Sequence, residues 1–259
     1  MPTGVAGTVP EPTGLVQSRD RRTVRSTYRL WEVSIVVAQN TTGSQPPPPG
    51  GFGTGTAEFI EGYVTEDPVL AAARAHAAEL GVQVSTPGCG ATLRLIAAVG
   101  NARSVVEVGT GTGVSGVWLL RGMRPDGVLT TIDLEAEYQR VARRIFAGAG
   151  FAPSRTRIIA GRALDVLPRL ADRVYDLVFV DHDTAEYPAG VAAAERLLRP
   201  GGVLVLGRAL AGGRLGDPAA RDPETVTVRE VVKALRDSDE WIPALLPIGT
   251  GLLAAARRG

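Results

Sequence analysis

The stretch Glu107-Val108-Gly109-Thr110-Gly111-Thr112-Gly113 decides the fold of this chain. It follows a short β-branched run, 104–108, and precedes a segment of helical pattern, 115–121. Glycines at such a turn let the backbone approach a ligand closely, and the following helix offers free N–H groups and the positive end of its dipole. The stretch therefore predicts a ligand-binding turn between a strand and a helix.

Strands and helices alternate on the C-terminal side of this turn. The further apolar runs typical of buried strands are 128–133, 156–160, 175–181 and 202–206. The amphipathic segments between them are 136–147, 163–170 and 189–198, and two more helices precede the turn at 71–80 and 90–99. Apolar strands separated by amphipathic helices predict a parallel sheet that is covered on both faces.

The alternation ends near the C-terminus. After a helix at 226–235, two strands at 241–246 and 251–256 are joined by only a few residues, Pro247–Thr250. Two strands with so short a link pair antiparallel. The predicted fold is therefore α/β: a doubly wound, mostly parallel, Rossmann-like sheet of seven strands that ends in an antiparallel hairpin.

The N-terminal part of the chain has a different composition. Residues 41–56 combine a proline run with glycines, a composition that cannot bury a core. Five arginines between 19 and 29 lead into the apolar run 33–38, which fits either a basic arm or a single strand. We predict that residues 1–56 form a disordered extension and that 57–259 form one folded domain with helices capping its N-terminal side.

Composition excludes several classes of protein. No apolar run approaches the roughly 18 residues that span a bilayer, and a single cysteine, Cys89, excludes a disulfide framework. With 28 basic and 27 acidic residues, the chain has no overall charge to attract nucleic acid. The N-terminus has no secretory pattern, so we expect a cytoplasmic protein.

The glycine turn has two interpretations. Gly111, Gly113 and Gly116 fit the spacing G-x-G-x-x-G, and Asp133 lies 20 residues past Gly113, where an acid binds ribose in an NAD(P)-dependent oxidoreductase. However, Glu107 places a carboxylate at a strand end, where a buried charge needs a cationic or hydrogen-bonding partner.

Two further motifs accompany the turn: Tyr175–Asp181, a strand that ends in an acid, and Leu197–Gly202 before the next strand. Together with the turn and the hairpin, they resemble class I S-adenosylmethionine-dependent methyltransferases, in particular the small-molecule O-methyltransferases related to the caffeoyl-CoA and catechol enzymes. The resemblance covers residues 58–259. It implies S-adenosylmethionine as cofactor, methyl transfer to a hydroxyl or carboxylate of a small molecule, and a homodimer.

The resemblance also implies site residues. Asp133 would accept the ribose hydroxyls with Leu134 beside the adenine, and Asp181 would lie at the junction of acceptor and cofactor as a catalytic and substrate-binding residue. Nearby carboxylates suit a donor that carries an ammonium and a sulfonium. The implied cofactor-binding positions are Ser85, Glu107, Gly109, Thr110, Gly111, Gly113, Ser115, Asp133, Leu134, Ala163 and Asp183.

The chain departs from the family pattern at the metal site. Metal-dependent members carry an Asp-Asn pair after the fifth strand, where this chain has Gly207-Arg208, and their lysine after the acidic pair is replaced by Thr184. An arginine cannot bind Mg²⁺, so we expect no divalent metal. Arg208 is a candidate catalytic residue that pairs with an anionic acceptor, or it forms a surface ion pair. The missing ligands also leave open a cofactor-binding homologue without catalytic activity.

Two candidates for the acceptor side remain. If Asp181 and Asp183 face the pocket, strand alternation turns His182 to the opposite face as a structural residue, and Asp181 is then the base if burial raises its pKa. Residues 209–223 are interpreted either as a lid whose Arg214 and Arg221 attract an acidic substrate or as a solvated loop.

Overall fold

The computed structural model describes residues 54–259, so the predicted N-terminal extension lies outside the described residues except for its last three. Those three begin a helix that the sequence did not predict, α1 (Thr54–Gly62). Its Glu61 reaches the start of another helix, α3 (Pro87–Val99), where its carboxylate accepts hydrogen bonds from Thr86 Oγ1 at 3.0 Å and Gly88 N at 2.7 Å.

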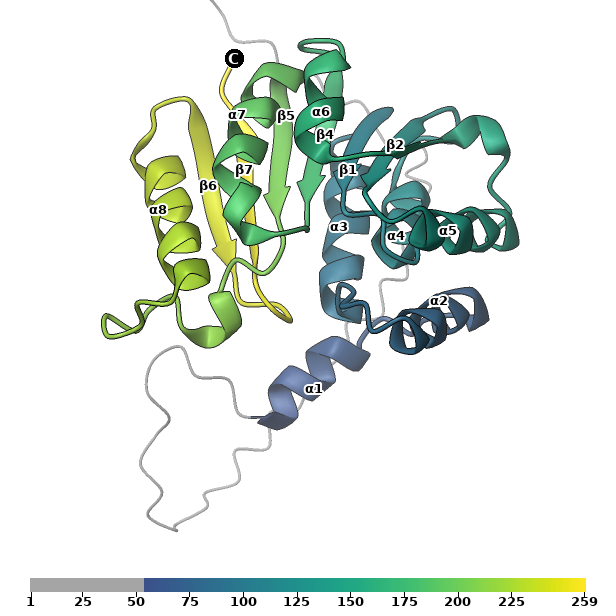
Figure 1. Ribbon diagram of the computed structural model, residues 1–259, viewed down its shortest axis with the longest axis horizontal. Helices are drawn as coiled ribbons and strands as arrows, with labels where there is room; N and C mark the ends of the chain where they lie inside the picture. The colour runs from purple at the N-terminus through teal and green to yellow at the C-terminus, as the bar shows by residue number, and fades with distance from the viewer. Residues whose placement is uncertain (1–53) are drawn as a thin grey trace, which may run out of the picture. The chain divides into compact units, whose positions relative to one another are not determined.

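Seven strands form one sheet in the order β3-β2-β1-β4-β5-β7-β6. The first five run parallel, and β7 pairs antiparallel with both β5 and β6, which confirms the predicted fold class (Figure 1). The strands are β1 (Ser104–Val108), β2 (Val128–Asp133), β3 (Thr156–Ala160), β4 (Tyr175–Val180), β5 (Leu198–Leu206), β6 (Trp241–Leu246) and β7 (Leu252–Arg257).

Helices cover both faces of the sheet. The remaining helices are α2 (Pro68–Glu79), α4 (Val114–Gly122), α5 (Ala136–Gly148), α6 (Ala163–Val166), α7 (Tyr187–Leu197) and α8 (Pro223–Asp237). Helices α2 to α5 share one apolar cluster with the sheet, and α6 to α8 share the other. Helix α2 begins three residues before the predicted 71, where Asp67 Oδ1 accepts a hydrogen bond from Leu70 N at 3.1 Å and Pro68 occupies the first turn.

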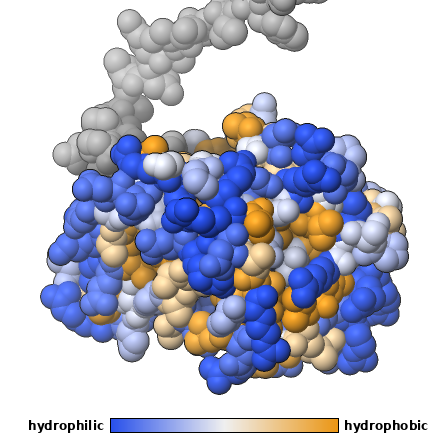
Figure 2. Space-filling model, turned by 90° about the horizontal axis from the view of Figure 1, so that it is seen from above, coloured by the Kyte–Doolittle hydropathy of each residue, from blue (hydrophilic) through white to orange (hydrophobic). Residues whose placement is uncertain are grey.

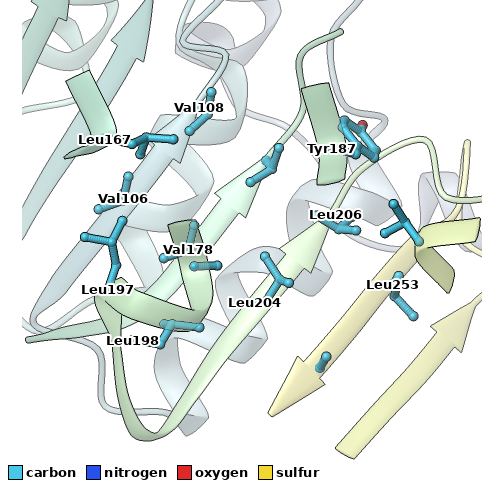
Figure 3. Close-up of a cluster of buried hydrophobic side chains, with 14 of the residues drawn as sticks. Val106, Val108, Leu167, Val178, Tyr187, Leu197, Leu198, Leu204, Leu206 and Leu253 are labelled. Atoms are coloured by element: carbon cyan, nitrogen blue, oxygen red, sulfur yellow. The ribbon is translucent and has the colours of Figure 1, made fainter. Parts of the chain in front are cut away.

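Strand alternation assigns the side chains of β1 to the two faces. Val106 and Val108 point into the cluster on the α7 side, where Leu197 and Leu204 meet them (Figure 3). The neighbouring positions of β1 therefore face α4, and one of them is Glu107. A carboxylate thus lies in an apolar layer, directly behind the carboxyl edge of the sheet.

The surface is mixed. In the view of Figure 2, hydrophilic residues cover most of the face, with smaller apolar areas between them. Among the described residues the large exposed apolar side chains include Phe59 and Tyr63 on α1 and Leu95 and Val99 on α3. Within residues 54–259, no helix combines the length and apolar composition that a bilayer crossing requires.

Candidate functional site

A cavity of about 470 Å³ opens at the carboxyl ends of β1, β2 and β4, a volume in the range of small-molecule pockets. This is the crevice where ligands bind in open α/β sheets. Its wall is formed by 82–85, by the turn 108–111 with Val114 and Ser115, by 132–134 with Tyr138, by 161–163, and by 181–183 with Glu186.

The glycine turn forms one wall of this pocket. Gly109 has a φ of 99°, and a Cβ there would collide with the carbonyl oxygen of Asp181, so only glycine fits between the two loops. Gly109, Thr110 and Gly111 line the pocket. Gly113 does not: it precedes α4 with a φ of 91°, and a Cβ would lie 3.2 Å from Ala142 on α5. Its role is the tight packing of the turn against α5.

Asp133 ends β2, next to the glycine turn, and lines the pocket. Its Oδ2 accepts a hydrogen bond from Gly111 N and its Oδ1 from Glu135 N, both at 2.9 Å. These bonds fix the carboxylate while each oxygen keeps a lone pair free for a ligand. Leu134 beside it is 61% exposed, and Ala163 lines the same pocket, so apolar surface adjoins a rigid hydrogen-bond acceptor.

Glu107 lies behind the wall and does not line the pocket. Its side chain is fully buried, its Oε2 accepts a hydrogen bond from Thr131 Oγ1 at 2.6 Å, and its Oε1 has no partner. Thr131 Oγ1 also lies 2.6 Å from Thr110 Oγ1. Burial raises the pKa of Glu107 to about 7, against the lowering effect of the hydroxyls of Thr131 and Ser115.

Asp181 begins the loop after β4 and lines the pocket. Its Oδ1 accepts a hydrogen bond from Arg208 Nε at 3.2 Å, and its Oδ2 accepts one from Ser85 Oγ at 3.1 Å. Burial raises the pKa of Asp181, and the charge of Arg208 and the bond from Ser85 act in the other direction. Ser85 therefore lines the pocket and also fixes the Asp181 carboxylate through this hydrogen bond.

Arg208 has a left-handed backbone, with φ of 46°, and does not line the pocket. Its side chain is 29% exposed, so its ion pair with Asp181 is half-buried rather than on the open surface. The arginine therefore balances the charge of the pocket carboxylate and does not face the cavity where an acceptor would bind. The suggested direct pairing of Arg208 with an anionic acceptor has no support in this geometry.

The prediction for His182 is wrong. Strand β4 ends at Val180, so alternation no longer applies, and His182 lines the pocket together with Asp183. His182 Nε2 lies 3.1 Å from Glu186 Oε2, and Arg162 Nη2 lies 3.4 Å from Glu186 Oε1. Burial lowers the pKa of His182. Asp183 also stabilises the short turn that follows, because its Oδ1 accepts a hydrogen bond from Ala185 N.

Several pocket residues were missed by the sequence analysis: Val82, Gln83, Val84, Tyr138, Arg162 and Glu186. They come from loops and from the first turn of α5, where no strand or glycine signal marks them. In the segment 209–223, Arg214 pairs with Asp222 and Glu224, and Arg221 donates to Pro218 O. Neither arginine lines the pocket, which favours the solvated loop over a lid that attracts an acidic substrate.

The residues at the family's metal position do not fit a divalent cation. A Cβ on Gly207 would lie 2.5 Å from Asp181 Oδ1, so a ligand side chain there would displace the Asp181 carboxylate, and the next residue is the arginine that pairs with Asp181. Among residues 54–259, no group of three or more His, Cys, Asp and Glu side chains could hold a metal ion.

Comparisons with known proteins agree with one another. A family model described as O-methyltransferase matches residues 64–258. A Mycolicibacterium paratuberculosis protein assigned as an O-methyltransferase is 51% identical over 219 residues, covering 83% of this chain and 99% of that protein. A Mycobacterium tuberculosis protein with the same assignment is 55% identical over 197 residues, covering 76% and 88%.

Solved structures give the same match. The O-methyltransferase TomG from Streptomyces achromogenes, involved in tomaymycin synthesis and crystallised with S-adenosylmethionine, superposes with a TM-score of 0.70. It is 33% identical, over 78% of this chain and 95% of TomG. A cofactor-bound Mycobacterium tuberculosis protein superposes with a TM-score of 0.71 at 32% identity, over 83% of this chain and 99% of that protein.

Proposed function

We propose that this chain holds its cofactor and activates its acceptor in the pocket described above. The chain belongs to the O-methyltransferase family and is an S-adenosylmethionine-dependent transferase. Family membership decides between the two interpretations of the glycine turn in favour of S-adenosylmethionine over a nicotinamide. The observation that carries the proposal is the convergence of the 109–111 turn, Asp133 and Asp181 on one cavity.

The described residues fit the cofactor by their chemistry. Asp133, held by two backbone N–H groups, is a preorganised acceptor for ribose hydroxyls, and Leu134 and Ala163 offer apolar surface to the adenine. The backbone at Gly109 and Thr110 and the hydroxyls of Ser85 and Ser115 suit the methionine part. Two buried carboxyl groups at this end, Glu107 and Asp181, match its positive charge.

The bound cofactor supplies an electrophilic methyl group on a positively charged sulfur. The acceptor oxygen must lose a proton as its bond to the methyl carbon forms and the carbon–sulfur bond breaks. Asp181 receives that proton, because burial raises its pKa and it lies in the wall of the pocket. Arg208 holds Asp181 Oδ1 and Ser85 holds Oδ2, so the carboxylate keeps one orientation during the reaction.

The acceptor is a small molecule, and its methylated group is a hydroxyl or a carboxylate. The acids that line the pocket are Asp133, Asp181, Asp183 and Glu186, and the guanidinium of Arg208 is already paired with Asp181. An acceptor hydroxyl that loses its proton during methyl transfer therefore suits the pocket better than a carboxylate that is already charged when it binds. Screening phenols and carboxylic acids of graded acidity with radiolabelled cofactor tests this order of preference, and turnover of any of them excludes an inactive homologue.

We propose that the reaction needs no divalent metal. Arg208 supplies, within the protein, the positive charge beside Asp181 that Mg²⁺ supplies in the related metal-dependent enzymes. Activity with an excess of a chelator should equal activity with added Mg²⁺. A loss of activity in chelator that Mg²⁺ restores would refute this part of the proposal.

We also propose a homodimer in the cytoplasm, where the cofactor is made. Helices α1 and α3 pack on each other and expose Phe59, Tyr63, Leu95 and Val99, which are between 61% and 79% exposed. A second copy would bury such side chains. Light scattering should give twice the mass of one chain, and Phe59→Glu with Leu95→Glu should give the mass of the monomer. Cell fractionation tests the location.

The decisive experiment is calorimetric titration of the full chain with S-adenosylmethionine, S-adenosylhomocysteine and NAD⁺, with and without Mg²⁺. We expect micromolar binding of the first two, unchanged by Mg²⁺ and lost in Asp133→Ala. Asp126→Ala is the matched control, because Asp126 is exposed and pairs only with Arg103 and Arg124. Binding of NAD⁺ alone would overturn the proposed pocket.

A further inference from the structure

Glu107 is the one fully buried acid among the described residues that has a carboxyl oxygen without a partner. Its neighbours in the sheet are Thr131 on β2 and Phe179 on β4, and α4 presents Gly116 and Ser115 to it. None of these carries a charge. A buried carboxylate without a cation is costly, so the fold favours the neutral, protonated form.

The charged groups that face Glu107 are also negative. Asp181 at the end of β4 and Asp133 at the end of β2 raise its pKa further. Asp181 is balanced by Arg208, but no basic side chain among residues 54–259 pairs with Glu107. His182 also lines the pocket, and burial lowers its pKa, which favours the neutral imidazole. A positive charge that favours the ionised form of Glu107 therefore has to come from a ligand.

The proposed cofactor site lies directly on the other side of the wall. Thr131 Oγ1 bridges Glu107 and Thr110 through two bonds of 2.6 Å, and both Thr110 and Ser115 line the pocket. A cation in this pocket would lower the pKa of Glu107, because only the buried side chains of Thr131, Thr110 and Ser115 separate them and electrostatic effects are strong in a buried layer. The sulfur of S-adenosylmethionine is a positively charged sulfonium, whereas the sulfur of its product S-adenosylhomocysteine is neutral.

We propose, resting on the proposed function, that Glu107 is a specificity-determining residue that releases its proton to solvent when the sulfonium enters the pocket. The ionised carboxylate then attracts the charged cofactor. Loss of the methyl group removes the positive charge from sulfur, and the carboxylate takes its proton back from solvent. Glu107 therefore makes the site hold the cofactor more tightly than the product and favours product release.

The test is calorimetry of the full chain in buffers of different ionisation enthalpy, which counts the protons exchanged on binding. At pH 7 we expect wild-type protein to release about half a proton with S-adenosylmethionine, clearly less with S-adenosylhomocysteine, and almost none with either at pH 8.5. Below pH 7 the affinity for S-adenosylmethionine should fall, by at most about tenfold per pH unit. The affinity for the product should change much less.

The variant Glu107→Gln assigns the effect. It should lose the difference in proton release between the two ligands, while any exchange from the ligands' own amine remains. Asp126→Asn is the matched control, because it removes an exposed acid that lies outside the pocket, and it should keep the proton release. If Glu107→Gln folds poorly by circular dichroism, Thr131→Val gives the second test: loss of the hydroxyl raises the pKa of Glu107 and should extend proton release to pH 8.

The outcomes separate this inference from the proposed function. Binding of S-adenosylmethionine without proton release, equal release with both ligands, or unchanged release in Glu107→Gln would overturn the role of Glu107 and leave the pocket assignment intact. No binding of either ligand at any pH would overturn both.

Discussion

Two buried carboxyl groups at the same edge of the sheet are surrounded very differently. Asp181, after β4, meets the guanidinium of Arg208 and the hydroxyl of Ser85. Glu107, on the adjacent strand β1, meets only hydroxyls, and one of its oxygens has no partner. Burial raises the pKa of both groups, but among residues 54–259 only Asp181 has a cation beside it that opposes this effect.

The difference shows how one pocket obtains two kinds of acid. A carboxylate with its own arginine keeps its orientation and has its charge balanced within the protein, which suits a residue that takes a proton from the acceptor. A carboxyl without a cation changes its charge when a charged ligand arrives. The following four changes test this contrast through the free energy of unfolding in urea, measured at pH 5 and pH 8.

The largest effect should come from Arg208→Gln, which leaves Asp181 without its cation. We expect a loss of about 3 kcal/mol at pH 8, because an uncompensated charge then stays in a largely buried site. The loss should become smaller as the pH falls toward 5, because burial raises the pKa of Asp181, and protonation removes the uncompensated charge. The double variant Asp181→Asn with Arg208→Gln should recover most of the stability. An equal loss at both pH values would mean that Arg208 acts through packing alone.

Glu107→Gln should have the opposite sign. The pKa of Glu107 is about 7 in the folded protein against 4.5 without the fold, so its contribution to stability is full below pH 4.5 and is lost as the pH rises through 7. The variant should therefore be more stable than the wild type at pH 8, by about 2 kcal/mol and at most about 3. Near pH 5 the difference should shrink to about 1 kcal/mol or less. A variant that is less stable at pH 8 would contradict an uncompensated Glu107.

Thr131→Val removes the hydroxyl that donates to Glu107. We expect a loss of about 1.5 kcal/mol at pH 8, where the acceptor is charged, and a smaller loss at pH 5. Thr131→Ser is the control, because it keeps the hydroxyl and should behave as the wild type within a few tenths of a kcal/mol. If Thr131→Ser loses as much as Thr131→Val, the effect lies in the packing of the methyl group.

Ser85→Ala should have the smallest effect, about 1 kcal/mol or less at pH 8. It removes the same kind of bond from Asp181 that Thr131→Val removes from Glu107, but Asp181 keeps Arg208. The ratio of the losses in unfolding free energy for Ser85→Ala and Thr131→Val thus measures how far Arg208 compensates Asp181 for a lost hydrogen bond. A loss at Ser85 larger than the loss at Thr131 would contradict the contrast drawn between the two acids.

Local patterns in the sequence predicted most of the fold. All seven strands occur where apolar runs are found, and β6 has the predicted bounds. Strand β5 starts four residues earlier than predicted, at Leu198, because the Pro-Gly pattern indicated a turn, whereas Leu198 still pairs with Tyr175 before a break in register. Helix α1 was missed because its glycines indicate a loop, while its Glu61 is fixed by distant contacts to α3.

Site residues that belong to a sequence motif at a strand end could be predicted, whereas site residues that lie in loops could not. The turn 109–111, Asp133 and Asp181 all lie at strand ends, so their place in one pocket followed from the order of elements. The position of His182 depends on where β4 ends, and one residue reverses the face of a side chain. The pairing of Arg208 with Asp181 joins residues 27 apart in the chain, which no local pattern reveals.

The contact between Gly109 and Asp181 has a mechanical consequence. The two loops touch backbone to backbone, with no room for even a methyl group between them, and each carries its own part of the pocket wall. Neither loop can shift toward the other, so a displacement of one must be passed on to the other. The width of the cavity is therefore fixed at this junction. Adaptation to acceptors of different size has to come from the wall segments 82–85 and 161–163.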